Sequence, residues 1–276
     1  MTYSPPQLGG NDMTKLALAA AFLILPSLAF AQGSAAPAPM PPAFNVVSQS
    51  SEYRFQMDFH VNDAALAKML PAGWVSNAAA QGAAKDANIR LIFIEAANIV
   101  GPDNKLLGKG NDVMVYAAAP VKEAGGPGTG QMILTGISQN QAGAAFGTIL
   151  AATSAKVSRS EATANGATTV TEDWELSAAG GEHASLHVKY MRAPANMGGG
   201  PVNFYNPADP KTFEIYRSQQ ATDITRNVTT NPPDRVSEFR YSAGGGKLAA
   251  LFDGSERALS WDSQPVYSRA VGTPAK

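Results

Sequence analysis

The dipeptide Asn165-Gly166 is the feature that most restricts what this chain can fold into. Asparagine followed by glycine accepts the left-handed backbone that a two-residue turn requires, so the pair is a strong short-range signal for a β-hairpin. Segments typical of strands flank it at 156–163 and 168–176. The pair therefore predicts that these two segments are neighbouring antiparallel strands.

Strand-like segments recur along most of the chain. From Tyr53 to Val61 apolar residues alternate with polar ones, which is the period of a half-buried strand. Further strands are expected where apolar or β-branched runs lie between turn signals. They cover 89–100, 112–120, 131–137, 184–192, 213–228, 235–242, 247–252 and 265–271.

Two short helices are expected among the strands. Asn62 is suited to cap the first, at 63–70, and the second spans 140–152, where alanine and glycine prevail. The Gly/Pro/Asn-rich segment 196–210 is long enough for a lid or an interface loop. These elements predict an α+β fold that is mainly β, with a curved sheet or closed β-barrel and a few short helices.

Composition bounds the function. A chain of 276 residues with 45% hydrophobic and 16% charged residues can bury a core but has few surface charges. The net charge is -1, so no basic field attracts nucleic acid. Cysteine is absent, so stability must come from the core or from assembly rather than from disulfides. Few charges also let apolar patches meet, and we expect a homo-oligomer.

The N-terminus has the features of an export signal over residues 1–31. Lys15 precedes an apolar run at 16–30, and the triplet Ala-Phe-Ala at 29–31 matches the small-x-small cleavage pattern. Met13 is an alternative start. The run is short for a membrane span, and a retained anchor is the alternative. We therefore expect a periplasmic or secreted protein without membrane contact after cleavage.

The mature chain is expected to begin with a flexible Ala/Pro-rich tether at 32–45, followed by a single domain at 46–272. N-terminal sequencing of the native protein should therefore start at or near Gln32. An intact Met1 or Met13 in a cytosolic fraction would contradict the signal peptide.

The stretch from Gly147 to Lys156 places a lysine among apolar and small residues. Burial removes the hydration of an ammonium group and favours the neutral amine, which is a nucleophile and can form Schiff bases with carbonyl compounds. Lys156 is therefore a candidate catalytic lysine. The alternative is that its side chain reaches from the strand into water.

Glu95 is a second candidate for chemistry. It shares a strand face with Leu91 and Phe93 and could donate or accept a proton there. An equally good interpretation is that Glu95 lies where the strand ends and a loop begins, and has no role in chemistry. The sequence has no Gly-x-Ser-x-Gly, no cysteine nucleophile and no His-Glu-x-x-His. We expect no metal and no cofactor.

Several motifs resemble, in order and spacing, the acetoacetate decarboxylase-like superfamily over roughly residues 52–271. The aromatic strand and the segment 63–74 are similar to the family's opening strand, helix and Leu-Pro-x-Gly-Leu turn. The other similar motifs are Ile-Arg-Leu-Ile-Phe at 89–93, the ten residues 147–156, Leu248, Leu-Phe-Asp at 251–253 and Pro-Val at 265–266. The resemblance implies the fold of that family, an oligomer, and a lyase or decarboxylase that uses a Schiff base.

The departures from the family pattern fall on the residues that carry its chemistry. Of two adjacent lysines in the family, the first forms the Schiff base and falls on Ala155, and only the second has a counterpart, Lys156. The family's active-site glutamate falls on Ile92. Its early arginine falls on Glu52, or on Arg54 if the register is shifted.

Two functions are compatible with these observations. The first is a Schiff-base lyase acting on a small β-keto or oxo-acid, with Lys156 as nucleophile and Glu95 as proton donor or acceptor. Arg54 and Arg90 would bind its substrate. The second is a non-catalytic periplasmic protein on the same fold that binds a small apolar or carboxylate ligand.

Overall fold

A computed structural model describes residues 44–141, 146–228 and 234–275. Within these residues twelve strands form one sheet, accompanied by two short helical segments. The strands are β1 (Phe44–His60), β2 (Trp74–Ser76), β3 (Ile89–Val100), β4 (Asn111–Glu123), β5 (Thr129–Ser138), β6 (Ile149–Ala164), β7 (Ala167–Ala178), β8 (His183–Met191), β9 (Asn196–Asn206), β10 (Asp209–Asn227), β11 (Val236–Gly244) and β12 (Arg257–Pro274). The helical segments are α1 (Asp63–Met69) and the 3₁₀ turn η1 (Leu248–Ala250).

Seven of these strands close into a ring in the order β5-β9-β10-β12-β1-β3-β4, because β4 also pairs with β5. The ring closes between β5 and β9 at Gln131 and Phe204. A Cβ atom on Gly130 would lie 2.1 Å from the carbonyl oxygen of Asn203, so glycine is what allows the two strands to approach here. The predicted fold class, mainly β with a closed curved sheet, is confirmed.

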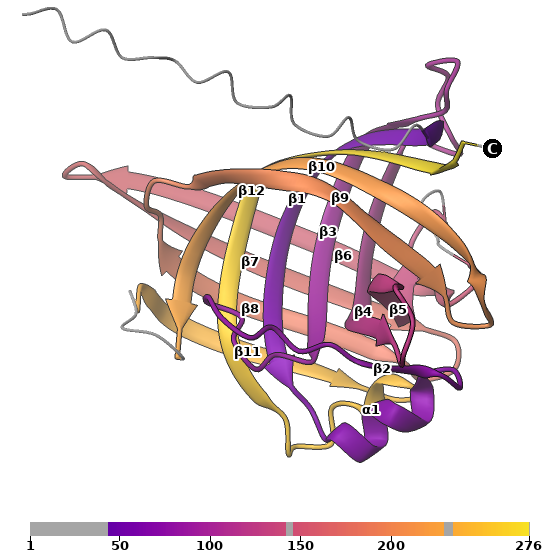
Figure 1. Ribbon diagram of the computed structural model, residues 1–276. Coiled ribbons are helices and arrows are strands. Elements are labelled where there is room, and N and C mark those ends of the chain that lie inside the picture. Colours follow the sequence, from indigo (N-terminus) through magenta and orange to yellow (C-terminus); the bar gives the residue numbers. More distant parts are fainter. Residues whose placement is uncertain (1–43, 142–145, 229–233, 276) are drawn as a thin grey trace, which may run out of the picture. The chain divides into compact units, whose positions relative to one another are not determined.

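The remaining long strands form a second layer. β6, β7, β8 and β11 continue the sheet from β5 and run behind β12, β1 and β3 (Figure 1). Apolar side chains of β1, including Phe55 and Phe59, share one core with Trp174 and Tyr190 of the second layer. A second cluster of buried apolar side chains, including Ile94 and others from β3, β4, β9 and β10, lies on the opposite face of the ring strands.

From Arg54 to Phe59, β1 is buried on both faces, not on one. Phe55 and Met57 enter the core between the layers, whereas the alternate side chains of Arg54, Gln56 and Asp58 are buried on the inner side of the ring. The alternation was therefore a correct signal for a strand, but the expectation that its polar face meets solvent is wrong. Ring closure creates a second interior, and the polar face of β1 lines it.

Two local predictions are confirmed. Asn165 and Gly166 have φ values of 51° and 77°, and they join β6 to β7 as a tight antiparallel hairpin. Asn62 caps α1, because its side-chain oxygen accepts hydrogen bonds from the backbone N–H groups of Ala64 and Ala65.

The helix expected at 140–152 is wrong for the part of that range that the structure describes, which excludes 142–145. Left-handed φ values at Gln141 (58°) and Phe146 (52°) interrupt any helix, and Ile149 begins β6 by pairing with β5. Alanine favours a helix over other ordinary residues by at most about 0.7 kcal/mol per residue, so strand pairing overrides this preference.

Two further expectations are wrong. The segment 196–206, expected as a lid or loop, is β9, which pairs along its length with β10 despite its three successive glycines. The segment 247–252, expected as a strand, contains η1. Buried Glu182 accepts hydrogen bonds from the N–H groups of Lys247 and Leu248, and these bonds favour a turn over an extended strand.

The signal and most of the tether lie outside the described residues. β1 begins at Phe44, two residues inside the range expected as tether. In the part of the chain that the structure describes, no helix has the length and apolarity needed to span a membrane.

Candidate functional site

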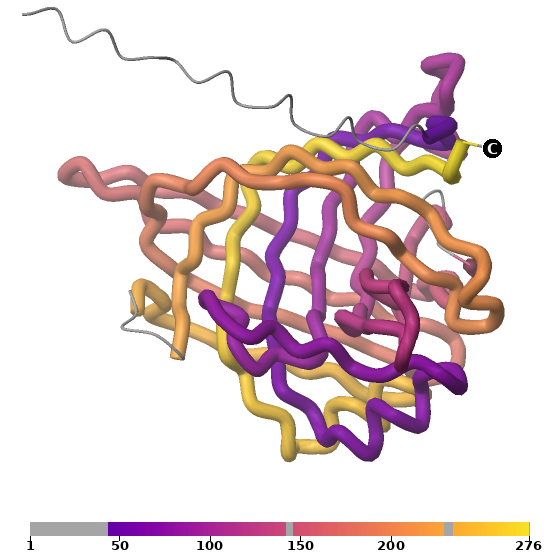
Figure 2. Tube along the Cα trace, in the orientation of Figure 1, coloured from indigo at the N-terminus to yellow at the C-terminus, as the bar shows by residue number. Residues whose placement is uncertain are grey.

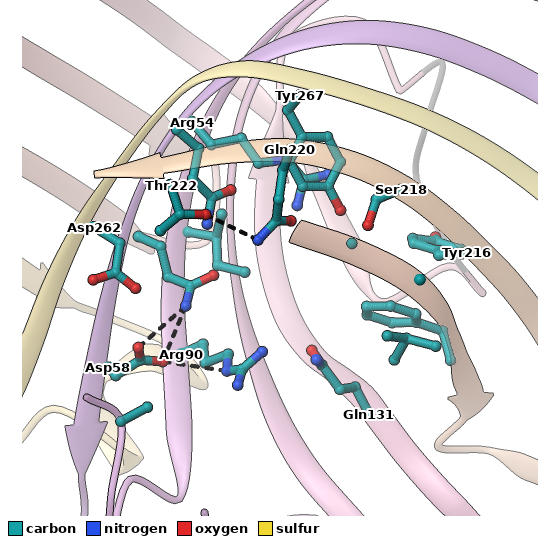
Figure 3. Close-up of a pocket in the computed structure, with 18 of the residues that line it drawn as sticks. Arg54, Asp58, Arg90, Gln131, Tyr216, Ser218, Gln220, Thr222, Asp262 and Tyr267 are labelled. Carbon is teal, nitrogen blue, oxygen red and sulfur yellow. Dashed lines mark hydrogen bonds and ion pairs between the residues drawn. The ribbon is translucent and has the colours of Figure 1, made fainter. Parts of the chain in front are cut away.

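A cavity of about 350 Å³ lies on the inner side of the seven-stranded ring. We call it the ring cavity. Every strand of the ring contributes to its wall, and Figure 3 shows the polar side chains that point into it. The segment between β2 and β3, purple in Figure 2, adds Ala83 and Ala84. A cavity of this size suits a small molecule.

Arg54, which lines the ring cavity, belongs to a buried cluster of two guanidinium groups and one carboxylate. Glu52 is fully buried and receives Arg54 Nε at 2.6 Å and Arg269 Nη2 at 2.8 Å. Burial alone would raise the pKa of Glu52, but the guanidinium groups of Arg269 and Arg54 hold it below its ordinary value. The Arg54 guanidinium lies 3.6 Å from the ring centre of Tyr267, a cation–π contact. Two cations therefore share one carboxylate.

Another part of the wall carries two carboxyl groups. Asp58 is fully buried, with Arg90 Nε at 3.2 Å, and it accepts hydrogen bonds from Gln56 Nε2 at 3.2 and 3.1 Å. Asp262 lies beside it on β12 and accepts a hydrogen bond from Ser260 Oγ at 2.8 Å. Figure 3 shows both carboxyl groups on the same side of the cavity.

The carboxyl group of Asp262 is poised to exchange a proton near neutral pH. Burial raises its pKa to about 7, and the neighbouring charge of Asp58 adds to the rise. Burial also raises the pKa of Asp58, against the opposing effect of Arg90. Two carboxylates with one nearby guanidinium leave excess negative charge on this side when both are ionised.

Two buried glutamines complete the polar lining. Within the part of the chain that the structure describes, the Oε1 atoms of Gln131 and Gln264 have no hydrogen-bond partner. Gln264 is 3% exposed and lies two residues from Asp262 on β12, so both face the cavity. A buried carbonyl oxygen without a donor costs free energy, so these amides favour a ligand that supplies N–H or O–H groups.

The structure separates the four residues expected to form the site. Arg54 and Arg90 both line the ring cavity. Glu95 lies outside it, with a side chain that is 43% exposed and paired with Arg159 at 3.1 Å. The burial expected for Glu95 from its strand neighbours is therefore not found, because its position lies near the exposed end of β3.

Lys156 also lies outside the ring cavity. Its side chain is 74% exposed, and Nζ lies 3.6 Å from the exposed carboxylate of Glu175. Ala155 packs against the core between the layers, and successive residues of a strand point to opposite faces, so Lys156 faces water. The condition for a desolvated, nucleophilic Lys156 is not met, and the alternative of a lysine reaching into solvent describes what is found.

Sequence reasoning missed most of the polar residues that do line the cavity. Asp58 lies on the polar side of the strand predicted at 53–61 as half-buried, and that period does not predict a cavity. Asp262, Gln131 and Gln264 were not recognised. A signal was present in β12, where Ser260, Asp262 and Gln264 repeat the polar alternation of β1. The shared polar face of two paired strands can point either to solvent or into a polar cavity. The alternation of polar and apolar residues does not distinguish these two cases.

A second buried polar cluster lies outside the ring cavity. Glu172 Oε1 accepts hydrogen bonds from Tyr53 at 2.8 Å and Tyr190 at 2.9 Å, and Oε2 accepts one from Trp174 at 3.1 Å. Burial raises the pKa of Glu172 despite the nearby charge of Arg159. Because both carboxyl oxygens have partners, this cluster ties the two layers together.

No protein-family model matches the chain, and no curated protein matches it. Solved structures similar to it include an acetoacetate decarboxylase-like enzyme from Sphingomonas wittichii RW1, with a TM-score of 0.49, 10% identity and coverage of 85% of this chain and 94% of that one. The acetoacetate decarboxylase of Legionella pneumophila has a TM-score of 0.46 and 12% identity, covering 87% and 93% of the two chains. The enduracididine biosynthesis enzyme MppR, complexed with pyruvate, has a TM-score of 0.46 and 13% identity, covering 87% and 91%.

Two of these three structures carry the name of the superfamily that the sequence motifs resemble. At these identities and TM-scores, they assign no activity and no residue role to this chain.

Proposed function

We propose that the protein is a non-catalytic binding protein that holds a small carboxylate ligand in the ring cavity. One observation carries the proposal: Arg54 lines the cavity and shares the single carboxylate of Glu52 with Arg269, which leaves one positive charge in excess beside the cavity. A buried guanidinium with free N–H donors is well suited to a carboxylate. The polar lining disfavours the apolar ligand that was the other possibility.

The lining residues favour binding over Schiff-base chemistry. Among the described residues that line the cavity there is no lysine. Lys156 and Ala155, the positions aligned with the paired lysines of the resembling family, lie on β6, which contributes no residue to the wall. A Schiff base needs an amine within reach of the bound carbonyl group, and this wall offers guanidinium and amide groups instead.

Borohydride added together with acetoacetate or pyruvate is therefore expected to trap no adduct on Lys156. An amine in water lacks the desolvation that favours its neutral, nucleophilic form. Intact-protein and peptide mass spectrometry after reduction would measure this. A stoichiometric adduct on one lysine, lost in the matching Lys→Ala variant, would contradict the non-catalytic proposal and revive the lyase.

Binding can be tested by calorimetric titration with acetate, butyrate, hexanoate, pyruvate and acetoacetate. We expect saturable binding of at least one of them. Thr222 points into the cavity, so Thr222→Trp should fill it and weaken that binding at least about tenfold, which corresponds to 1.4 kcal/mol. Lys156→Ala, on the exposed face of β6, is the matched control and should leave affinity unchanged. Binding that survives Thr222→Trp would place the ligand elsewhere.

A further inference from the structure

The side of the ring cavity that carries Asp58 and Asp262 is negatively charged, and a simple carboxylate ligand has no group that would pair with this charge. We propose that the ligand also carries a protonated amine, so that it is a small amino-acid-like zwitterion whose ammonium group binds Asp262 and Gln264. This inference rests on the proposed function and specifies its ligand class.

Charge balance is the first argument for an ammonium group. Arg90 contacts Asp58, and among the described residues no lysine or arginine lies within ion-pair distance of Asp262. The charges of Asp58 and Asp223 therefore repel ionised Asp262, while that of Arg90 attracts it. Arg90 and Arg235 are already paired with Asp58 and Asp223, so neither is an ion-pair partner of Asp262. A ligand cation relieves this repulsion, whereas a neutral hydroxyl group does not.

Hydrogen-bond chemistry is the second, independent argument. An ammonium group has three donors and no acceptor. Gln264, only 3% exposed, offers an Oε1 atom that no described residue satisfies, on the same strand face as the Asp262 carboxylate. An ammonium group placed between them would donate to both. The described residues contain no group of three His, Cys, Asp or Glu side chains that could hold a metal ion instead.

The two charged regions are close enough for one small ligand. Across β1 and β12, Arg54 pairs with Gln264 and Gln56 pairs with Asp262. Arg54 and Asp262 are therefore diagonal neighbours, whose Cβ atoms in a regular ladder lie about 7–8 Å apart or somewhat less. Figure 3 shows Asp262 on one side of the cavity, with Tyr267, which stacks on Arg54, at the top. A short chain can join a carboxylate near Arg54 to an ammonium group near Asp262.

Calorimetric titration at pH 8 with three matched series tests the proposal. The probes are the ω-amino acids from glycine to 6-aminohexanoate, the unsubstituted acids of equal length, and the corresponding amines. We expect the tightest-binding amino acid to bind at least about tenfold better than its matched acid and its matched amine, the discrimination of one buried charge-assisted hydrogen bond. 

Asp262→Asn should remove this discrimination, so that the amino acid and the acid bind equally, while binding of the acid itself persists. Gln264→Met, which leaves both carboxyl groups in place, should reduce the preference without abolishing it. Asp103→Asn, in an exposed turn, is the control and should change neither affinity. 

A pH series separates a charge effect from a loss of shape. Affinity for the amino acid should rise between pH 5 and pH 8 as Asp262 ionises, with Asp58, Arg90 and Asp223 as the charged groups that face it. Affinity for the matched acid should not rise. In Asp262→Asn the rise should disappear.

The outcomes distinguish this inference from the proposed function. If acids bind as tightly as amino acids, or if the preference survives Asp262→Asn, the zwitterion is wrong and a carboxylate-binding protein remains. If amines alone bind, or no probe binds, the proposed carboxylate function fails together with the inference.

Discussion

Replacing Glu52 with glutamine is expected to destabilise the folded protein by about 3–5 kcal/mol, the range for breaking a buried ion pair by removing one partner. The Glu52 side chain is 0% exposed and lies between Arg54 and Arg269, which are almost as deeply buried. In the variant, two buried guanidinium groups would face each other without an anion. Urea unfolding at pH 7 measures the loss as a shift of the transition midpoint.

The matched control removes the charges together. The triple variant Glu52→Leu, Arg54→Met, Arg269→Met replaces the triad with apolar side chains of similar length and should recover most of the stability lost in Glu52→Gln. Glu175→Gln breaks the exposed pair with Lys156 and should change the free energy of unfolding by less than about 1 kcal/mol. If Glu52→Gln proved as stable as Glu175→Gln, the carboxylate of Glu52 would not be needed for the stability of the folded protein, and the prediction would be wrong.

Most strands were predictable because they are a local property of the sequence. The hairpin at Asn165-Gly166 and the alternation in β1 report backbone conformation directly, and both correspond to what forms. The exceptions are segments where composition and pairing disagree. β9 has the glycine content of a loop but becomes a strand, because β10 supplies partners along its whole length.

The site was less predictable because it depends on which face of each strand is enclosed. Lys156 and Ala155 are neighbours on β6, and a difference of one position decides whether a side chain enters the core or water. The sequence around them is apolar and small on both sides, so it carries no period that fixes the face. Arg54 and Arg90, expected to bind a substrate, both line the ring cavity, whereas placing Asp262 there requires knowledge that β12 closes beside β1.

Asp262→Asn is expected to stabilise the protein at pH 8 while leaving its stability near pH 4 unchanged. In the unfolded chain the carboxyl group ionises near its ordinary pKa of 3.8, whereas in the folded protein burial and the charge of Asp58 raise the pKa to about 7. Between these values the folded state binds more protons than the unfolded state. The contribution of Asp262 to the free energy of unfolding therefore falls as pH rises from about 4 to about 7, and the penalty is complete above that.

Asparagine carries no charge at any of these pH values, so the variant does not lose free energy of unfolding as the pH rises through this range. A shift of this size corresponds to about 4 kcal/mol, since one pKa unit is worth about 1.4 kcal/mol. Urea unfolding of both proteins from pH 4 to pH 8.5 measures the difference, in which contributions of other buried acids such as Glu172 largely cancel. A gain of the same size at every pH would assign the effect to packing, and a loss at pH 8 would contradict it.

The same substitution is predicted to remove the preference for an amine-bearing ligand. Asp262→Asn should therefore raise the stability of the free protein at pH 8 and weaken its binding of the amino acid. An ionised carboxylate enclosed in a wall with too few cations lowers the stability of the free protein. A bound ammonium group supplies the missing charge, and saturating ligand should therefore raise the unfolding midpoint of the unsubstituted protein more at pH 8 than at pH 5. Asp262→Asn should show no such difference between the two pH values, because its cavity wall no longer gains a charge that the ligand can neutralise.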